Sequence, residues 1–558
     1  MKYVANNLSF NKNESTLLVL ARDYGQQALK YLLITSIVLI TLSKLNLIGT
    51  GFLAFPDEIR YCQSGRVVQH LSELKIDAAM KEIFSTQGRP ADAIIKIIPN
   101  AIQYVTARIF KINYYERKNS YPLFIFNFLI YCLILIVHYK LSNLLLKDSF
   151  LALVSVLLFS TLTNSYLYLR HALPYDMGLL ILYIVIYKIA LYTEEDNLSY
   201  TKSLIIGMCS LFGLLVYPGY FPLLIVGLFI LLFNKISKEN IFKKIYYAGY
   251  YILGSILCLI LCEKIARLVG KSYILDAIGL SKTITQGSFE ESFAYLFKYF
   301  IEVEGLTGII LLIGLLVFIS ITLYRFKNKT FKQYSLISLL GIGLIGMYLV
   351  YASTGYFFHK MVFYGRLLHQ YVPFICILSI YSINETLTKV TRKSQLILCL
   401  ISIIFIGNFW FSFINYNSYS YPRDILWQLI KENKLNGVGN VLEFDDSWPV
   451  MPKGSELICT DIHGKPINSY YNIIEVGSNF GGTIYIVNEL TKHYIFNPND
   501  NYHLLQSKPS FMNFKAYQYD SGANMIDRHN MDKMNMQIKI FTPAGQTTGF
   551  ISQKKVGN

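Results

Sequence analysis

Long apolar runs recur through the first three-quarters of this 558-residue chain, and they limit what it can fold into. Three of them read "LIYCLILIV", "LLIVGLFILLF" and "GIILLIGLLVFISITLY". With its flanks, each run is long enough to cross a hydrocarbon core, which takes about 20 helical residues. Backbone groups inside lipid must satisfy their own hydrogen bonds, so the runs must be helices. Because 53% of the residues are hydrophobic and only 15% are charged, we predict a polytopic α-helical membrane protein.

About eleven transmembrane helices are predicted from these runs. Their approximate bounds are 26–44, 120–138, 150–169, 175–192, 203–217, 219–233, 245–267, 306–324, 334–353, 367–386 and 395–416. The fifth and sixth share one apolar stretch that is broken by "YPGYFP". Pro218 and Pro222 favour a tight reversal there, and one tilted, kinked helix is the alternative.

Basic residues between the runs indicate the orientation in the membrane. Lys and Arg collect in cytoplasmic loops, so neighbouring basic clusters should be separated by an even number of spans. The reversal at "YPGYFP" satisfies this condition and the single kinked helix does not. The N-terminus is then cytoplasmic, and everything after residue 416 is extracytoplasmic. Since the net charge of +16 is explained as this topology signal, we expect no nucleic-acid partner. The clusters are Lys140 and Lys147; Lys188 and Lys202; Lys235, Lys238, Lys243 and Lys244; Arg325, Lys327, Lys329 and Lys332; and Lys389, Arg392 and Lys393.

The chain divides into two predicted domains. Residues 1–416 form the transmembrane domain, whose large first outer loop covers about 45–119 and includes "ADAIIKIIPNAIQYVTARIF", an amphipathic stretch suited to the membrane interface. Residues 417–558 form a soluble extracytoplasmic domain of α/β or α+β type. Its amphipathic "YPRDILWQLIKENKL" predicts a helix, and "GNVLEF", "ELICTDI" and "GGTIYIVNEL" predict short strands.

The segment "FPDEIRY", directly after the first apolar run, holds the main catalytic candidates, Asp57 and Glu58. A carboxylate at the outer membrane boundary can act as a general base, taking the proton of an acceptor hydroxyl. Inverting glycosyl transfer needs one such base on the face opposite the leaving group. The alternative is a helix cap or a surface acid. Arg60 and Arg66 follow closely.

The segment "YLYLRHALPYDMGLL" is a second candidate. The predicted topology places Arg170, His171 and Asp176 in a very short outer loop, at the depth of Asp57. An Asp at the start of a span is costly unless it is solvated or paired, which favours a functional role. The alternative for Asp176 is a cap of the following helix.

The segment "FFHKMVFYGRLLHQYVPF" brings His359, Lys360, Tyr364 and Arg366 to the same outer face. A cation there can hold a lipid-linked phosphate through charge-assisted hydrogen bonds and stabilise it as it leaves. The alternative is snorkelling at the interface, which is our interpretation of Lys360. Arg366 stands at the head of a span among apolar residues and is the better phosphate candidate.

Taken together, these motifs resemble the GT-C superfamily of membrane glycosyltransferases. "PDEIRY" after the first span, "LRHALPYDMGLLIL", "GLLVYPGYFPLLIVGLFILLF" and "FYGRLLHQYVPF" carry the resemblance, which covers roughly residues 26–416. It is closest to the branch of lipid A aminoarabinose transferases, protein O-mannosyltransferases and related bacterial enzymes. The resemblance does not extend to the C-terminal region.

The resemblance implies residue roles. Asp57 would be the base or acceptor-binding acid, Glu58 its support, Asp176 a second active-site acid and Arg366 a phosphate contact. Many relatives have a lysine in the hairpin turn where this chain has "YPGY", so other cations would have to help bind the phosphate. The candidate substrate-binding residues are Arg60, Arg170, His171, Lys271, Lys282, His359, Lys360, Tyr364 and Arg366.

The expected function is transfer of a sugar, with inversion, from a polyprenyl-phosphate carrier to an extracytoplasmic acceptor. The acceptor is an O-antigen or other surface glycan, lipid A or a protein, and the location is a bacterial inner membrane. No cofactor is expected, although the Asp57–Glu58 pair could hold a divalent ion. The alternatives are a flippase or transporter, which should carry ionisable residues near mid-membrane, and a polymerase or ligase of lipid-linked glycans.

Overall fold

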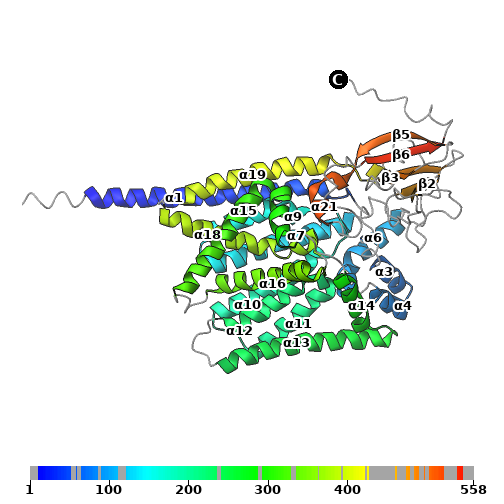
Figure 1. Cartoon of the computed structure of the whole chain (residues 1–558), viewed down its shortest axis with the longest axis horizontal. Helices are drawn as coiled ribbons and strands as arrows, with labels where there is room; N and C mark the ends of the chain where they lie inside the picture. Colours follow the sequence, from blue (N-terminus) through cyan, green and yellow to red (C-terminus); the bar gives the residue numbers. More distant parts are fainter. Residues whose placement is uncertain are drawn as a thin grey trace, which may run out of the picture.

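The computed structural model describes residues 10–51, 58, 64–85, 89–110, 121–234, 241–286, 292–328, 335–361, 363–390, 394–421, 424–425, 459–460, 473–477, 483–488, 495–496, 502–520 and 537–543. Long helices dominate this part of the chain and lie roughly side by side (Figure 1).

Seven of the described helices are long and apolar enough to cross a membrane. Many of their outward side chains are large and apolar, as at Leu39, Leu253 and Phe411, which suits lipid rather than water. The prediction of an α-helical membrane protein is therefore confirmed. These spans are Gln27–Leu47 (the end of α1, Phe10–Ser43, with η1, Lys44–Leu47), α7 (Tyr121–Leu146), α10 (Tyr175–Glu194), α13 (Ile241–Leu268), Ser292–Lys327 (η4, Ser292–Ala294, with α15, Tyr295–Lys327), α16 (Leu336–Phe358) and α19 (Ser394–Ser418).

Four shorter apolar helices complete the bundle: α8 (Ser149–Thr161), α11 (Tyr200–Val216), α12 (Phe221–Phe233, preceded by η3, Pro218–Tyr220) and α18 (Val372–Val390). The hydroxyl of Tyr251 on α13 lies 2.8 Å from Ser210 Oγ on α11 and 3.0 Å from the Leu224 carbonyl on α12. A straight helix would separate those two residues by about 20 Å. The chain therefore reverses at 217–220, which confirms the predicted hairpin.

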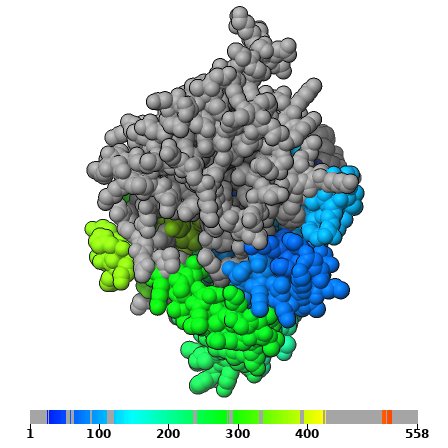
Figure 2. Space-filling view, turned by 90° about the vertical axis from the view of Figure 1, so that its right-hand side faces the viewer, coloured from blue at the N-terminus to red at the C-terminus, as the bar shows by residue number. Residues whose placement is uncertain are grey.

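One end of the bundle collects most of the short described helices, and we call it the site end (Figure 1). They are α3 (Ser64–Ser72), α4 (Ile76–Ile83), α5 (Pro90–Ile95), α6 (Ile97–Phe110), α9 (Thr163–Tyr166), α14 (Tyr273–Gln286) and α17 (Gly365–Leu368). Figure 2 views this end of the molecule. Blue residues that follow the first span lie beside green residues from the middle of the chain. Exposed apolar side chains follow one another along α6 at Ile98, Ile102, Val105 and Ile109, which agrees with the amphipathic pattern predicted there.

The C-terminal region contributes antiparallel strands. A four-stranded sheet has the order β2-β3-β6-β5, formed by Ile473–Gly477, Thr483–Asn488, Gln537–Pro543 and Tyr502–Pro509, while β1 (Cys459–Thr460) pairs with β4 (Ile495–Phe496). Strands β1 and β3 fall in the predicted "ELICTDI" and "GGTIYIVNEL"; "GNVLEF" and most of the predicted helix after Tyr421 lie outside the described residues. After β5, η6 (Phe511–Asn513) and α21 (Lys515–Asp520) return to the site end, where α21 contacts α15 and α17.

Candidate functional site

Two buried acid–histidine pairs lie at the site end, and one short segment supplies a member of each. Between α8 and α10 the chain carries Asn164, Arg170 and His171, with the four-residue α9 as the helix there, and Asp176 lies in the first turn of α10. Leu162 and Pro174 flank this segment; Pro174 stands at the N-cap of α10. The segment therefore places polar side chains inside the bundle end, where all four are buried.

The first pair is Glu58 and His171. The carboxylate of Glu58 is 0% exposed; its Oε1 lies 3.0 Å from His171 Nδ1, and its Oε2 accepts from the backbone N–H of Ala172 at 3.0 Å. A buried carboxylate is tolerated when both oxygens are hydrogen-bonded in this way. Asn127 on α7 holds the same turn by donating to the His171 carbonyl at 2.8 Å. Glu58 therefore ties the chain after the first span to the segment before α10.

A chain of hydrogen bonds leads from His171 to Arg170. His171 Nε2 lies 2.6 Å from the Tyr517 hydroxyl, which lies 3.0 Å from the Tyr421 hydroxyl, and Tyr421 accepts from Arg170 Nη1 at 2.8 Å. Burial raises the pKa of Tyr421 and of Tyr517, so both phenols keep their protons at neutral pH. One consistent set of protons runs from Arg170 through both phenols to His171 Nε2. His171 Nδ1–H then donates to Glu58.

Arg170 is held by aromatic and amide groups. Its guanidinium lies 3.9 Å from the ring centroid of Tyr416, and Nη2 donates to Asn417 Oδ1 at 2.8 Å. The stem passes so close to Gly51 that a Cβ there would come within 2.8 Å of Arg170 Cδ. Gly51 also has a φ of +74°, a conformation that glycine adopts at little cost. With its Nη groups so engaged, Arg170 is linked to His171 through the hydroxyls of Tyr421 and Tyr517.

An ion pair on α5 supports the same turn from the other side. Lys96 Nζ lies 2.9 Å from Asp92 Oδ1, and both side chains are almost fully buried. The same Nζ donates to the Ala172 carbonyl at 3.3 Å. Burial raises the pKa of the Asp92 carboxyl, and the charge of Lys96 acts in the opposite direction. Ala172 is thus held through its N–H by Glu58 and through its carbonyl by Lys96.

The second pair is Asp176 and His369. His369 Nε2 lies 2.9 Å from Asp176 Oδ1, and His369 Nδ1 lies 2.8 Å from Asn164 Oδ1. Asn164 is oriented by its own contacts, because its Nδ2 donates to the Tyr299 hydroxyl at 2.8 Å and its N–H donates to Glu304 Oε1 at 2.9 Å. Both ring nitrogens of His369 therefore face oxygen atoms. A ring nitrogen that carries a proton can therefore donate to one of these oxygens, Nε2 to Asp176 and Nδ1 to Asn164.

Arg366 lies beside this pair with its guanidinium fixed on several sides. Its Nε and N–H donate to Asp520 Oδ1, at 3.1 and 2.9 Å, and Nη2 donates to the Asp520 carbonyl at 2.8 Å. Nη1 donates to the Tyr175 hydroxyl at 2.9 Å, and the guanidinium lies 4.8 Å from the ring centroid of Tyr364. Tyr168 joins the two groups, since its ring packs edge-on against Tyr175 and against His369. A cation and an acid–histidine pair are therefore neighbours here.

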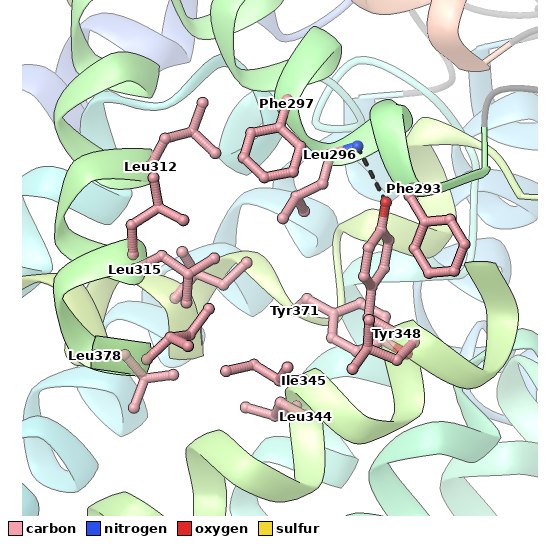
Figure 3. A pocket seen from close by; sticks show the side chains of 14 residues that line it. Phe293, Leu296, Phe297, Leu312, Leu315, Leu344, Ile345, Tyr348, Tyr371 and Leu378 are labelled. Carbon is pink, nitrogen blue, oxygen red and sulfur yellow. Dashed lines mark hydrogen bonds between the residues drawn. The ribbon is translucent and has the colours of Figure 1, made fainter. Parts of the chain in front are cut away.

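An apolar cavity of about 150 Å³ opens between α15, α16 and α18 (Figure 3). Tyr348 crosses one side of it, its hydroxyl accepting from the Leu296 N–H at 3.1 Å. The cavity adjoins the site end through Phe363, whose ring packs against Tyr348 and Tyr295. Its lining includes Phe293, Phe297, Leu312, Leu315, Leu344 and Tyr371.

The structure separates the predicted site residues into groups. Asp57 and Arg60 lie outside the described residues. The first cluster is the Glu58–His171 pair with the residues bonded to it, and it includes Arg170. The second cluster is the Asp176–His369 pair with its neighbours, and it includes Tyr364 and Arg366. The remaining four candidates have exposed side chains and do not take part in either cluster: Lys271, Lys282, His359 and Lys360.

Sequence reasoning missed several members of these clusters. His369 stands three residues after Arg366, a spacing that puts two side chains on the same side of a helical turn, so this signal was present. Asn164 precedes the predicted loop and had no signal. Tyr517 and Asp520 belong to the C-terminal region, and only the folded chain brings them to the site end. Within the described ranges, no group of three or more His, Cys, Asp and Glu side chains is arranged to hold a metal ion.

The site end has the parts for acid–base chemistry on an anionic ligand. Asp176 can exchange a proton with His369, and Arg366 offers charge-assisted hydrogen bonds to an anion. No protein-family model, curated protein or solved structure matches this chain. Inferences about its function therefore rest on this geometry and on the sequence motifs.

Proposed function

We propose that this chain is a glycosyltransferase of GT-C type that moves one sugar, with inversion, from a polyprenyl-phosphate carrier to an extracytoplasmic acceptor. The observation that carries the proposal is the meeting of Asp176, His369 and Arg366 at one end of the helix bundle. An acid that can take the proton of an acceptor hydroxyl and a cation that can hold the leaving phosphate are the two groups that such a transfer requires.

The apolar cavity between α15, α16 and α18 supports a lipid-linked donor. A prenyl tail is a linear series of apolar units that each carry a methyl branch, and a dry cleft between membrane helices offers it contact without polar partners. Tyr371 lines this cavity, and among the described residues its buried hydroxyl has no hydrogen-bond partner. The cavity adjoins Phe363, close in the chain to Arg366, so a tail lying there would carry its phosphate toward Arg366.

The proposal includes eleven spans and one orientation. The four shorter apolar helices would cross the membrane together with the seven long ones. Basic clusters would then face the cytoplasm, and the site end would face outward from a bacterial inner membrane. The C-terminal region would form an extracytoplasmic α/β domain. The acceptor would be a surface glycan such as O-antigen, lipid A or a protein.

The sequence position of Asp57, directly after the first span, gives it the role of base or acceptor-binding acid. The roles of the other carboxylates follow from their hydrogen bonds. Glu58 would hold Asp57 in place, since both of its oxygens bind the turn at His171 and Ala172. Asp176 would act on substrate, and Arg366 would contact phosphate. No metal is needed for these steps.

The test is incubation of the purified protein with a polyprenyl-phosphate sugar and, separately, with a polyprenyl-diphosphate sugar. Consumption of the monophosphate donor, lost on replacing Asp57→Asn or Asp176→Asn but retained on replacing Lys282→Ala, is the expected result. Consumption of the diphosphate donor alone would indicate a polymerase or ligase. Consumption of neither would contradict the proposal.

A transporter of lipid-linked sugars is the second candidate, and buried ionisable residues favour it. Lys44 is fully buried, where its Nζ donates to the Ser160 carbonyl at 2.6 Å, and Glu304 accepts from the N–H of Thr163 at 2.8 Å. Charged groups inside a helix bundle often mark a transport path. Movement of a labelled lipid-linked sugar between leaflets, without cleavage of its phosphate bond, would support this candidate.

A further inference from the structure

The helix α21 brings the C-terminal region into the candidate site. Ala516 and Tyr517 are 0% exposed, and Asp520 is also buried. Two outer contacts seat the helix on α15. The Tyr519 carbonyl accepts from the Tyr295 hydroxyl at 3.1 Å, and the Tyr519 hydroxyl donates to Glu302 Oε2 at 2.8 Å. A segment about 100 residues beyond the last transmembrane helix is therefore packed among the outer helix ends.

Asp520 fixes the orientation of Arg366. Its Oδ1 accepts from both the backbone N–H and Nε of Arg366, and its carbonyl accepts from Nη2. Two of these bonds, from Nε and Nη2, hold one edge of the guanidinium, and the bond from the backbone N–H keeps the Asp520 carboxylate beside it. Tyr175 meets the other side through Nη1. An arginine held in this way presents its charge in one place, which lowers the ordering cost of binding an anion.

Tyr517 acts in the same manner on the first cluster. Its hydroxyl lies 2.6 Å from His171 Nε2 and 2.8 Å from the Tyr416 hydroxyl. Tyr416 gives its own proton to the Leu167 carbonyl at 2.9 Å, so the single hydroxyl proton of Tyr517 goes either to Tyr416 or to His171 Nε2. When Tyr517 donates to Nε2, the ring proton must sit on Nδ1, facing Glu58. This tautomer is the one that bonds the carboxylate.

We propose that Asp520 and Tyr517 are positioning residues: Asp520 orients Arg366 toward the donor phosphate, and Tyr517 sets the His171 tautomer that holds Glu58. This inference rests on the proposed function and deepens it, because it makes the C-terminal region part of the active site. The opposite role for Asp520 is competition, in which its carboxylate occupies the phosphate position and must leave. The two roles predict opposite signs when the carboxylate is removed.

The experiment uses the full chain in lipid nanodiscs, with undecaprenyl phosphate as the probe. Asp520→Ala should weaken probe binding roughly tenfold, as a loss of about 1.4 kcal/mol produces. Asp520→Asn should recover part of the affinity, since its amide oxygen can still accept from Arg366. Lys515→Gln is the matched control, because Lys515 lies on the same helix, 3.7 Å from Glu302, and outside both clusters.

Equal or tighter probe binding by folded Asp520→Ala would overturn the positioning role and favour competition. If the wild-type chain binds no undecaprenyl phosphate, the proposed function fails, and amide exchange then decides the inference. Asp520→Ala should speed hydrogen exchange at the backbone N–H of Arg366, which donates to the Asp520 carboxylate. Tyr517→Phe should speed hydrogen exchange at the backbone N–H of Ala172, which donates to Glu58. Unchanged exchange at both amides, matching Lys515→Gln, would overturn it.

Discussion

Each acid–histidine pair joins a carboxylate to an imidazole, but the pairs differ in how many carboxylate oxygens already have a protein donor. Glu58 is fully buried, and each of its oxygens has a protein partner. The side chain of Asp176 is 8% exposed. Its Oδ1 faces His369, and among the described residues no protein donor is seen for its Oδ2. The first carboxylate is therefore committed to the fold, whereas the second can still meet a ligand.

This difference predicts a structural role for Glu58 and a role in the reaction for Asp176. Removing Glu58 should cost mainly stability, because two buried donors lose their acceptor. Removing the charge of Asp176 should cost mainly turnover, because its fold contact is a single hydrogen bond that an amide oxygen can replace.

The largest effect is expected for Asp176→Asn. If Asp176 acts on the substrate proton, kcat should fall roughly 10²- to 10⁴-fold, the usual contribution of a general acid or base. The melting temperature should change little, since Asn keeps an oxygen near His369 Nε2. Sugar transfer and thermal unfolding in the same detergent check both parts. Turnover near the wild-type level would remove Asp176 from the mechanism.

Glu58→Ala should destabilise the protein by about 4 kcal/mol, because it leaves His171 and the Ala172 N–H buried without their acceptor. Equilibrium unfolding in detergent measures the loss. Any fall in activity should follow the unfolded fraction and recover at lower temperature. A fully folded variant with no activity would place Glu58 in the chemistry instead.

Lys96→Met should destabilise by about 3 kcal/mol, since it leaves the Asp92 carboxylate buried without its partner. Burial raises the folded-state pKa of Asp92, so the folded chain holds this proton to a higher pH than the unfolded chain, whose Asp titrates near pH ~3.9. Stability of Lys96→Met should therefore decline as pH rises above about 4. Adding Asp92→Asn should remove this pH dependence; a persistent slope would assign it to another group.

Gly51→Ala should destabilise by about 2 kcal/mol, because a Cβ at φ +74° is strained and meets Arg170. The same change at Gly249, where a Cβ meets nothing within 4 Å, is the control. Thermal unfolding should separate the two variants. The KM for donor should stay unchanged in both, since Arg170 belongs to the Glu58 side; a raised KM in Gly51→Ala alone would move Arg170 to the substrate.

The smallest effect is expected for Lys282→Ala. Its side chain is exposed on α14, and surface changes of this kind usually stay within about 0.5 kcal/mol. Turnover should remain within about twofold of wild type in the donor assay. A larger loss would bring α14 into the donor site.

Much of the architecture was predictable from the sequence, because the signals involved are local. Runs of apolar residues report burial in lipid directly, and "YPGYFP" marks the reversal through residues that cannot continue a helix. The amphipathic pattern of α6 is likewise visible in the order of its residues. Arg170, His171, Asp176 and Arg366 were found because charged residues at the ends of apolar runs are few.

The partners of those residues depended on tertiary structure. Nothing near "FPDEIRY" indicates that Glu58 binds His171, 113 residues later, or that the Tyr517 hydroxyl contacts the other nitrogen of the same ring. Nor could the sequence distinguish a committed carboxylate from an available one, because that depends on donors supplied by other segments. Composition and periodicity thus determined the membrane helices, whose stability comes from local hydrogen bonds and lipid. Long-range packing alone decided which acids are held and which is left open.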